Sequence, residues 1–238
     1  MDALITDATS QDEGRRASRV AVLPVGSFEQ HGDFLPLVTD TAVACMIAKR
    51  IAKDYDLFLL PPITISCSHE HARMPGTVSI SAATLHALVN DIWRSLQESG
   101  TERLLIVSGH GGNYVLSNVV QEANVRHPRM ALFPVREDWN RARLDAGLET
   151  TTHDDMHGGE LEVSLLLHAA PELVRPGYEG ADHDAPERPH LLTLGMTGYT
   201  PNGIIGAPSH GTAAKGASLL ASLSRSAVAH LEILSKGY

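Results

Sequence analysis

The sequence is poor in the features that mark several common classes of protein. Only two of its 238 residues are cysteines, Cys45 and Cys67, and they form no C-x-x-C motif. We therefore expect no disulfide framework and a reducing compartment, the cytoplasm. No apolar run is long enough to cross a membrane, and the first twenty residues lack the apolar segment of a signal peptide. We expect residues 1–19 to form a flexible tail, and we expect no membrane partner.

Basic residues gather nowhere along the chain. Lys and Arg number 19 against 28 Asp and Glu, which gives a formal net charge of -9 at pH 7 with His neutral. Because nucleic-acid binding requires a cluster of positive charge, we expect no nucleic-acid partner. Histidine is frequent instead, with 13 copies, several of them beside glycine or acidic residues. Imidazole is a metal ligand and a base near neutral pH, so these histidines point to a chemical site.

Short apolar runs alternate with longer amphipathic segments. The runs at residues 20–25, 57–60, 104–107 and 130–135 predict strands, and the segments at 41–53, 82–98 and 115–126 predict helices. Ser81 is placed to cap the second of these helices, and Asn113 precedes the third. This alternation predicts a single α/β domain over residues 20–238, with a mostly parallel sheet between helices on both faces. Ligands of such folds bind at the carboxyl ends of the strands.

The composition changes in residues 172–210, which are rich in Pro, Gly, His and Asp. We expect long loops there, with room for a short hairpin. Residues 213–234 are rich in Ala, Leu and Ser at helical spacing, and predict a helix that closes the domain.

Three polar residues follow the first expected strand: Glu29, His31 and Asp40. Two carboxylates and an imidazole form a ligand set that zinc, manganese and iron accept, and one carboxylate can bridge two ions. The alternative is that Glu29 and His31 are ordinary loop residues and that Asp40 is the N-cap of the next helix. Their spacing alone leaves both interpretations open.

A glycine-rich loop, Ser108-Gly-His-Gly-Gly-Asn113, follows the third expected strand. Glycine permits close approach of the backbone to a ligand, so the loop would present His110 at the carboxyl edge with little steric cover. Phosphate binding at the next helix and a purely structural turn are the alternatives. The pattern matches neither G-x-G-x-x-G nor the phosphate loop with its lysine.

Residues 154–162 hold another group of acidic and histidine residues. If a helix begins near Gly158, Glu160 and Glu162 lie in its first turns, where the helix dipole favours carboxylates even without a ligand. Residues two apart on a helix point to different sides, so at most one of the two can reach the same ion as His31. His157, just before the turn, is placed to act as a general acid or base.

Glu70 and His71 follow the second expected strand, in a loop that also contains Pro75-Gly76. With His69 they do not form the H-E-x-x-H helix of zinc peptidases, because the two histidines are two positions apart. We expect Glu70 and His71 to face the substrate; a solvated polar loop is the alternative.

Together these motifs resemble the creatininase family of metal-dependent amidohydrolases. The matching segments are Glu29-Gln-His-Gly with Thr39-Asp40, Glu70-His71 with Pro75-Gly-Thr, Gly109-His-Gly-Gly-Asn113, and Asp155-x-His-Gly-Gly-x-x-Glu162. They follow the family's order along the chain. A later segment, Pro201-Asn-Gly-Ile-Ile-Gly206, is similar to the branch that processes the mycofactocin precursor peptide.

The resemblance implies an α/β fold, two divalent ions per chain (zinc, manganese or iron) and a cyclic homo-oligomer, often a hexamer. The metal ligands that it implies are Glu29, His31, Asp40, which is expected to bridge, and His110. It also implies that His157 is catalytic.

The chain departs from the family pattern at two places. Creatininase proper has a liganding glutamate where this chain has Gly112, and we expect Glu162 to supply the missing oxygen. The common H-G-P-H is altered, because Asp33 and Phe34 follow Gly32. We therefore expect Asp33 and Phe34 to shape a substrate pocket, and both departures argue against creatinine as the substrate.

The resulting hypothesis is a hydrolase that cleaves an amide or peptide C–N bond with a metal-activated water, while His157 passes a proton to the leaving nitrogen. One alternative is a cyclic amidohydrolase or a deformylase that acts on small molecules of a biosynthetic pathway. Another is a family member that binds metal without catalysis. A nucleotide-binding domain would require a phosphate loop, which the sequence lacks.

Overall fold

A four-stranded parallel sheet forms the centre of the molecule in the computed structural model, which describes residues 6–236. The strand order is β2-β1-β3-β4. The strands are β1 (Val20–Val25), β2 (Phe58–Leu59), β3 (Arg103–Ser108) and β4 (Met130–Phe133). All three pairings are parallel, and β1 and β3 pair from Val20 and Arg103 to Val25 and Ser108. The predicted α/β class is confirmed.

The central strands are apolar on both faces, as expected of a parallel sheet that helices cover on each side. Val22 and Leu105 pack into one core cluster, whereas their neighbours Ala21 and Leu104 pack into the other. The alternation of side chains along each strand therefore divides the core into two halves.

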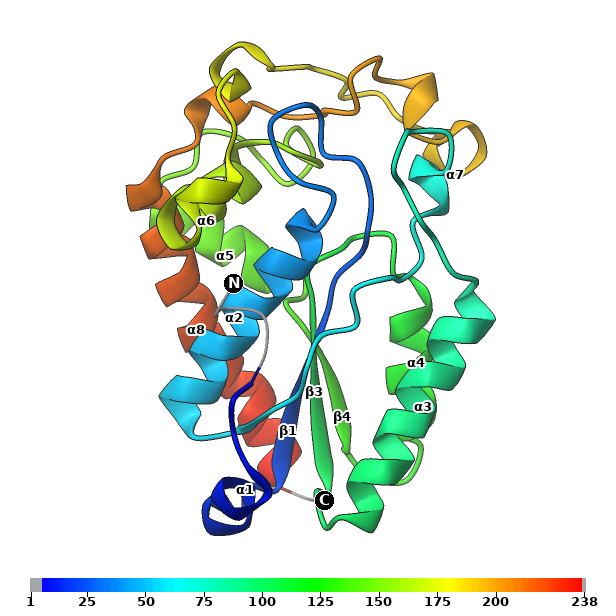
Figure 1. The fold of residues 1–238 in the computed structure, drawn as a ribbon, viewed down its shortest axis with the longest axis vertical. Coiled ribbons are helices and arrows are strands. Elements are labelled where there is room, and N and C mark those ends of the chain that lie inside the picture. The colour runs from blue at the N-terminus through cyan, green and yellow to red at the C-terminus, as the bar shows by residue number, and fades with distance from the viewer. Residues whose placement is uncertain (1–5, 237–238) are drawn as a thin grey trace.

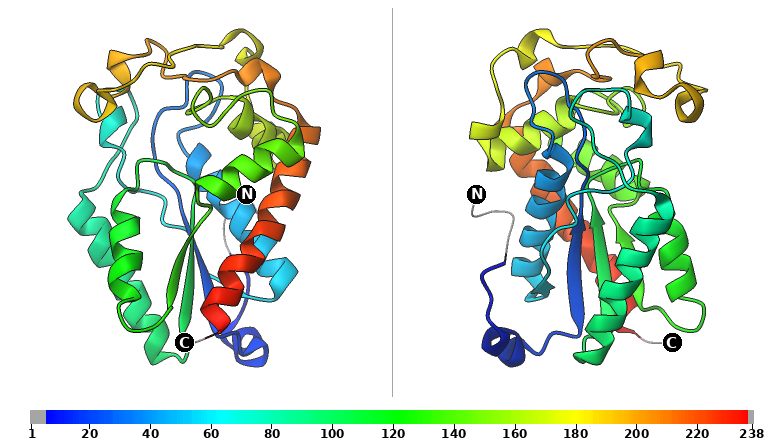
Figure 2. Two further views of the ribbon diagram at one scale, coloured as in Figure 1. Left: turned by 180° about the vertical axis from the view of Figure 1, so that it is seen from behind. Right: turned by 45° about the vertical axis from the view of Figure 1, so that its right-hand side comes forward.

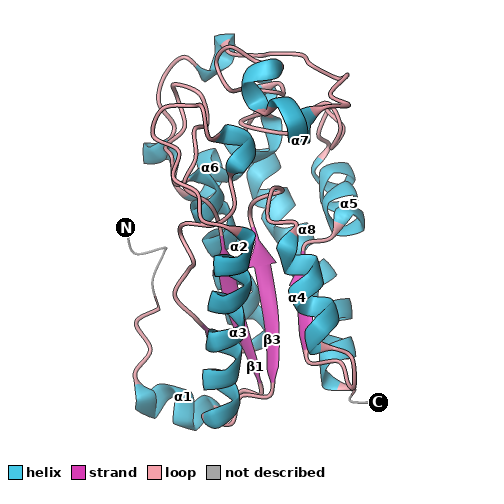
Figure 3. Ribbon diagram, turned by 90° about the vertical axis from the view of Figure 1, so that its right-hand side faces the viewer, coloured by secondary structure: helices cyan, strands magenta, loops and turns pink. Residues whose placement is uncertain are grey.

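Helices cover both faces of the sheet (Figures 1 and 2). On one face lie α2 (Thr39–Tyr55), α5 (Arg136–Ala146), α6 (Glu160–Ala169) and α8 (Ala213–Ser235), and on the other lie α3 (Ala82–Glu98) and α4 (Val115–Ala123). Figure 3 shows the strands enclosed between these layers. No described helix is both long enough and apolar enough to cross a membrane.

The predicted helices form, with corrections at their ends. Ser81 caps α3 by accepting a hydrogen bond from the backbone N–H of Thr84 at 3.1 Å, as expected. Asn113 does not cap α4, because its side chain accepts from the backbone N–H of Cys67 instead. β4 ends before Pro134, which has no N–H to donate. The highly charged α5 lacks a clear apolar stripe and was not foreseen.

The N-terminal segment contains a short helix, α1 (Ser10–Arg16), within the range expected to be a flexible tail. Thr9 caps it by accepting a hydrogen bond from the backbone N–H of Asp12. Residues 1–5 of that range lie outside the described residues.

Residues 171–210 pass over the carboxyl end of the sheet, at the top of Figure 1. They form the short helices η2 (Pro171–Leu173), η3 (Tyr178–Gly180), α7 (Leu191–Leu194), η4 (Met196–Gly198) and η5 (Pro208–His210). The hairpin considered above is absent from this described segment, whose strand-like pairing is limited to isolated bridges. One bridge joins Ile205 to His157, so this cover is attached directly to a candidate site residue.

Candidate metal centre

The predicted ligands come together above the carboxyl ends of β1 and β3. Glu29 and His31 lie in the loop that follows β1, and Asp40 lies in the first turn of α2. His110 follows β3, and Glu162 lies in the first turn of α6. This convergence follows from the topology, because parallel strands direct the loops at their carboxyl ends to one edge of the sheet.

Asp40 lies between two histidines from different segments. Its Oδ1 is 3.1 Å from Nε2 of His31, and its Oδ2 is 3.0 Å from Nδ1 of His110. Ser27 donates a hydrogen bond to Oδ2 at 2.7 Å. The N-cap of α2 is Val38, so Asp40 does not have the capping role considered above. One carboxylate thus presents an oxygen to each of two imidazoles, which is the arrangement needed to bridge two ions.

Two groups of three ligands can be drawn around Asp40: Glu29, Asp40 and His110, and His31, Asp40 and Glu162. Within each group the ligand atoms lie within 4.8 Å of one another. Oε2 of Glu29 is 3.3 Å from Nε2 of His110, and Oε1 of Glu162 is 3.7 Å from Nε2 of His31. Each group therefore combines two carboxylates with one imidazole, which suits zinc, manganese or iron.

Glu29 is the strongest sign that these groups hold a cation. Its side chain is fully buried, and neither carboxylate oxygen has a hydrogen-bond partner among the described residues. Burial, followed by the neighbouring Asp40, raises the pKa of Glu29 to about 8. A buried carboxylate that faces imidazoles but accepts no hydrogen bond is costly, and a divalent cation would offset that cost. The residues present therefore fit a metal centre.

The carboxylates and imidazoles of the site shift one another's pKa values toward the charged forms. Although burial opposes ionisation, His31 and His110 hold the pKa of Asp40 well below its usual range. Burial also opposes protonation of His31, but Asp40 and Glu162 raise the pKa of this imidazole well above its usual value.

Glu160 and Glu162 separate as the helical spacing predicts. Glu162 faces His31, whereas Glu160 points to the opposite side, where it accepts hydrogen bonds from Lys215 and from the backbone N–H groups of residues 149 and 150. Only Glu162 is therefore placed to serve as a ligand with His31.

His157 lies against the ligands, with its ring centroid 4.1 Å from that of His31. Its Nε2 is 2.7 Å from the backbone oxygen of Gln30 and donates to it, which leaves Nδ1 unprotonated and 3.6 Å from Oε1 of Glu29. Burial, followed by the charge on His31, lowers the pKa of His157 to about 4. The ring is therefore neutral at pH 7, with a free base directed into the centre.

The other predicted site residues divide into two pairs. Glu70 and His71 line a cavity of about 380 Å³ together with Asp40, His110 and His157. Asp33 and Phe34 are not among the residues that line it: Asp33 is exposed, and Phe34 is buried in the core beside Tyr178. The structure thus brings Glu70 and His71 to the centre, and the role predicted for Asp33 and Phe34 stays a prediction.

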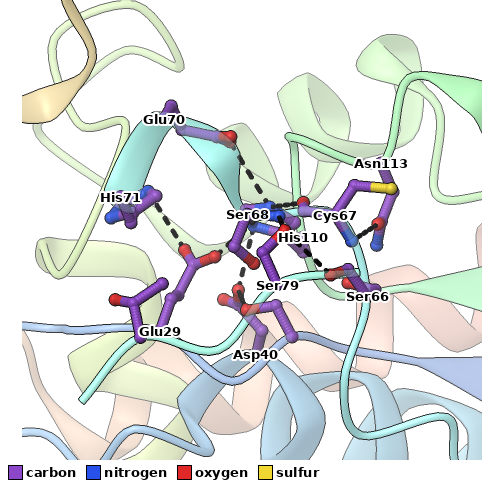
Figure 4. Close-up of polar contacts among 12 residues, drawn as sticks. Glu29, Asp40, Ser66, Cys67, Ser68, Glu70, His71, Ser79, His110 and Asn113 are labelled. Atoms are coloured by element: carbon purple, nitrogen blue, oxygen red, sulfur yellow. Dashed lines mark hydrogen bonds and ion pairs between the residues drawn. The ribbon is translucent and has the colours of Figure 1, made fainter. Parts of the chain in front are cut away.

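Figure 4 shows Glu70 and His71 on one turn, η1 (His69–His71), above Glu29 and His110. Nε2 of His71 is 3.2 Å from Oε1 of Glu29. Burial, followed by the neighbouring imidazole of His157, lowers the pKa of His71. Burial opposes ionisation of Glu70, but His110 lowers the pKa of this carboxyl. An ionised carboxylate and a neutral imidazole therefore border the cavity.

Two buried groups at the site were not foreseen. Nε2 of Gln30 donates to the backbone oxygen of Gly203 at 3.1 Å, which connects the ligand loop to the covering segment. Asp155 accepts hydrogen bonds from Arg143 and from the backbone N–H of Glu160, and so fixes the start of α6. Gln30 and Asp155 both lie inside motifs that the sequence analysis singled out. Their place in those motifs is the sequence feature from which a role at the site could have been predicted.

The glycine-rich loop lies among the candidate metal ligands and does not form a phosphate site. A side chain at Gly109 would place its Cβ 2.2 Å from the backbone oxygen of Asp40, so this glycine allows β3 to end against α2. His110 in the same loop faces the carboxylates of Glu29, Asp40 and Glu70, which would repel an anion. Neither the phosphate-binding alternative nor the nucleotide-binding one gains support.

Comparison with known proteins identifies the family. The family model described as "Creatininase: Creatinine amidohydrolase" matches residues 6–231. The mycofactocin precursor peptide peptidase of Mycolicibacterium smegmatis is 34% identical over 215 residues, which cover 86% of this chain and 81% of that protein. The chain belongs to the creatininase family. Creatinine amidohydrolase of Pseudomonas putida, another relative, is 28% identical over 171 residues, which cover 65% of this chain and 66% of that protein.

Solved creatininases share the fold. The crystal structure of a creatinine amidohydrolase superposes with a TM-score of 0.81 at 22% identity and covers 98% of this chain and 99% of its own. Creatininases described as a Zn-Zn type and a Mn form both give a TM-score of 0.79. As a creatininase-family member with this clustered ligand set, the chain is a hydrolase that acts on C–N bonds.

Proposed function

We propose that this creatininase-family protein hydrolyses the peptide bond of a short peptide at a centre of two divalent ions. The observation that carries the proposal is the position of Asp40, whose two oxygens face His31 and His110 at 3.1 and 3.0 Å. A carboxylate placed between two ligand groups can bridge the pair of ions that a two-metal hydrolase uses.

Glu29, Asp40 and His110 would hold one ion, and His31, Asp40 and Glu162 would hold the other. When bound, the ions would supply an acidified water and a polarised carbonyl, which is the usual chemistry of two-metal hydrolases. Zinc, manganese and iron all suit these ligands.

His157 would carry the proton. Its unprotonated Nδ1 points to the ligand group, and the hydrogen bond from Nε2 to the backbone oxygen of Gln30 fixes the ring. The attacking water loses a proton to Nδ1 and bonds to the carbonyl carbon. The proton then passes to the leaving nitrogen as the C–N bond breaks, so the products are a carboxylic acid and an amine. Such a transfer accelerates hydrolysis by about 10²–10⁴.

The peptide substrate is favoured by the 34% identity to a peptidase of the mycofactocin pathway. The cavity of about 380 Å³ is walled partly by Leu132, Trp139 and Leu161, and so offers apolar surface for side chains beside the metal ligands. Glu70 and His71 border it as the substrate-facing residues. A small cyclic amide or a formamide remains the alternative substrate class, and the experiment below separates the two.

The test combines metal analysis with a substrate screen. Protein freed of metal by a chelator is reconstituted with zinc, manganese or iron, and is offered short peptides, cyclic amides and formamides while the released amine is measured. Two ions per chain with metal-dependent release from peptides support the proposal. Absence of bound metal at saturating concentrations contradicts it, as does unchanged hydrolysis in His157→Ala.

We further propose, from the family resemblance, a cytoplasmic homo-oligomer, with a hexamer as the expected assembly. Sedimentation velocity across a range of protein concentrations measures this directly, and a monomer throughout that range would contradict it.

A further inference from the structure

Glu70 and Gly112 occupy neighbouring space on the wall of the metal centre, although they are far apart in the sequence. Oε1 of Glu70 lies 3.4 Å from Nε2 of His110 (Figure 4). A Cβ added at Gly112 would lie 2.0 Å from that same oxygen and 2.4 Å from Nε2 of His110. A side chain at position 112 and the Glu70 carboxylate therefore exclude each other.

The surroundings hold Glu70 in this place. Its side chain is 15% exposed, and its backbone belongs to the turn η1. The covering segment packs on this turn, because a Cβ at Gly195 would lie 2.7 Å from the backbone oxygen of Glu70. The carboxylate thus projects over the loop that follows β3 from a supported position.

The position of Glu70 affects which nitrogen of His110 carries the proton and which faces Asp40. Nε2 of His110 is 2.9 Å from the backbone oxygen of Cys67, and the carboxylates of Glu29 and Glu70 face the same nitrogen at 3.3 and 3.4 Å. With acceptors at Nε2, the proton stays on that nitrogen, and Nδ1 is directed at Asp40. Partners of this kind fix the tautomer of a ligand imidazole and raise its basicity.

We propose that Glu70 is a positioning residue for His110, and that the lack of a side chain at Gly112 leaves the room its carboxylate needs. In this chain Gly112 has no side chain, so a carboxylate from another loop supports the ligand histidine. This inference rests on the proposed metal centre.

The experiment measures zinc affinity, by competition with a chelator of known affinity, alongside peptide hydrolysis. Glu70→Gln preserves the shape of the side chain, and we expect it to weaken zinc binding at one site by about 10- to 100-fold. Glu70→Ala removes the carboxylate altogether and is expected to weaken zinc binding at least as much as Glu70→Gln. Gly112→Ala is expected to weaken zinc binding too, because its Cβ would meet both the Glu70 carboxylate and the His110 ring.

The matched glycine control is Gly180→Ala, which lies outside the cavity and where no described atom beyond its immediate neighbours comes within 4 Å of an added Cβ. The exposed Glu98→Gln is the matched control for charge. Circular dichroism and thermal melting of each variant verify folding, and both controls should bind zinc as the unaltered protein does.

The outcomes separate this inference from the proposed function. If the unaltered protein binds two zinc ions and Glu70→Gln binds them equally well, the inference is wrong while the metal centre stands. A raised KM in Glu70→Gln at unchanged zinc affinity also overturns it, and assigns Glu70 to the substrate instead. If the unaltered protein binds no zinc, the proposed function and this inference fail together.

Discussion

Replacing Asp155 with alanine is expected to lower the free energy of unfolding by about 3–5 kcal/mol, because it leaves one partner of a buried ion pair alone. Nη2 of Arg143 donates to Asp155 Oδ2 at 2.9 Å, and the two side chains are only 7% and 2% exposed. The same carboxylate accepts hydrogen bonds from the backbone N–H groups of Glu160, Leu161 and Ala207. The loss is large beside a total stability of roughly 5–15 kcal/mol.

Urea unfolding of chelator-treated protein, followed by circular dichroism, measures this effect apart from metal binding. Asp154→Ala is the matched control: this neighbour is exposed and its carboxylate bonds only to Thr151 among the contacts described. Its cost is expected to stay within about 0.5 kcal/mol. The reasoning is refuted if Asp155→Ala is no less stable than Asp154→Ala.

A double-mutant cycle tests whether the ion pair between Arg143 and Asp155 is the source of this stability. Arg143→Met should also be strongly destabilising, because it leaves Asp155 as an unpaired buried charge. Removing both partners leaves no buried charge, so Arg143→Met with Asp155→Ala should cost clearly less than the sum of the two single variants. Additive costs would show that the ion pair is not the source of the stability.

Other expectations concern the centre directly. His157→Ala should lower kcat by about 10²–10⁴ without loss of bound zinc, whereas the exposed His127→Ala should leave kcat unchanged; equal rates would contradict the proton-transfer role. Glu29→Gln should lose one zinc ion per chain by elemental analysis, because a ligand carboxylate is replaced with a neutral amide; an unchanged zinc content would contradict its role as a ligand. Zinc returned to metal-free protein at about 100 times its Kd should add about 2.7 kcal/mol of stability, seen as a rise in Tm; an unchanged Tm would speak against a native-state site. Gly109→Ala should cost about 1–3 kcal/mol in urea unfolding, because its Cβ would lie 2.2 Å from the backbone of α2, whereas Gly111→Ala should be close to neutral.

The sheet could be predicted because the buried parts of its strands are continuous apolar runs. β1, Val20–Val25, was predicted with its observed bounds, and its five residues after Val20 are all buried. A continuous apolar run bounded by polar segments is the expected pattern of a strand covered on both faces. α5 escaped prediction for the opposite reason: among its eleven residues only Ala142 and Arg143 are buried, so no apolar stripe shows in the sequence.

The candidate ligands could be predicted because each follows a strand or begins a helix at the same edge of the sheet. For Glu160 and Glu162, the helical angle between residues two apart was enough to predict that one at most would face His31. The structure places Glu162 there and Glu160 against Lys215. The topology of the sheet and the geometry of the helix together predicted which residues would meet, and no single motif predicts this by itself.

Closeness in the sequence to a candidate ligand did not predict which residues line the cavity. Phe34 lies three positions after His31, yet the loop turns at Gly32, where φ is +67°, and Phe34 enters the core beside Tyr178. Glu70 is far from His110 in the sequence, yet its carboxylate comes within 3.4 Å of the imidazole. Contact between them requires both the turn η1 and the missing side chain at Gly112. Each of these is unremarkable in the sequence by itself, so their pairing could be recognised only once the two loops were placed side by side.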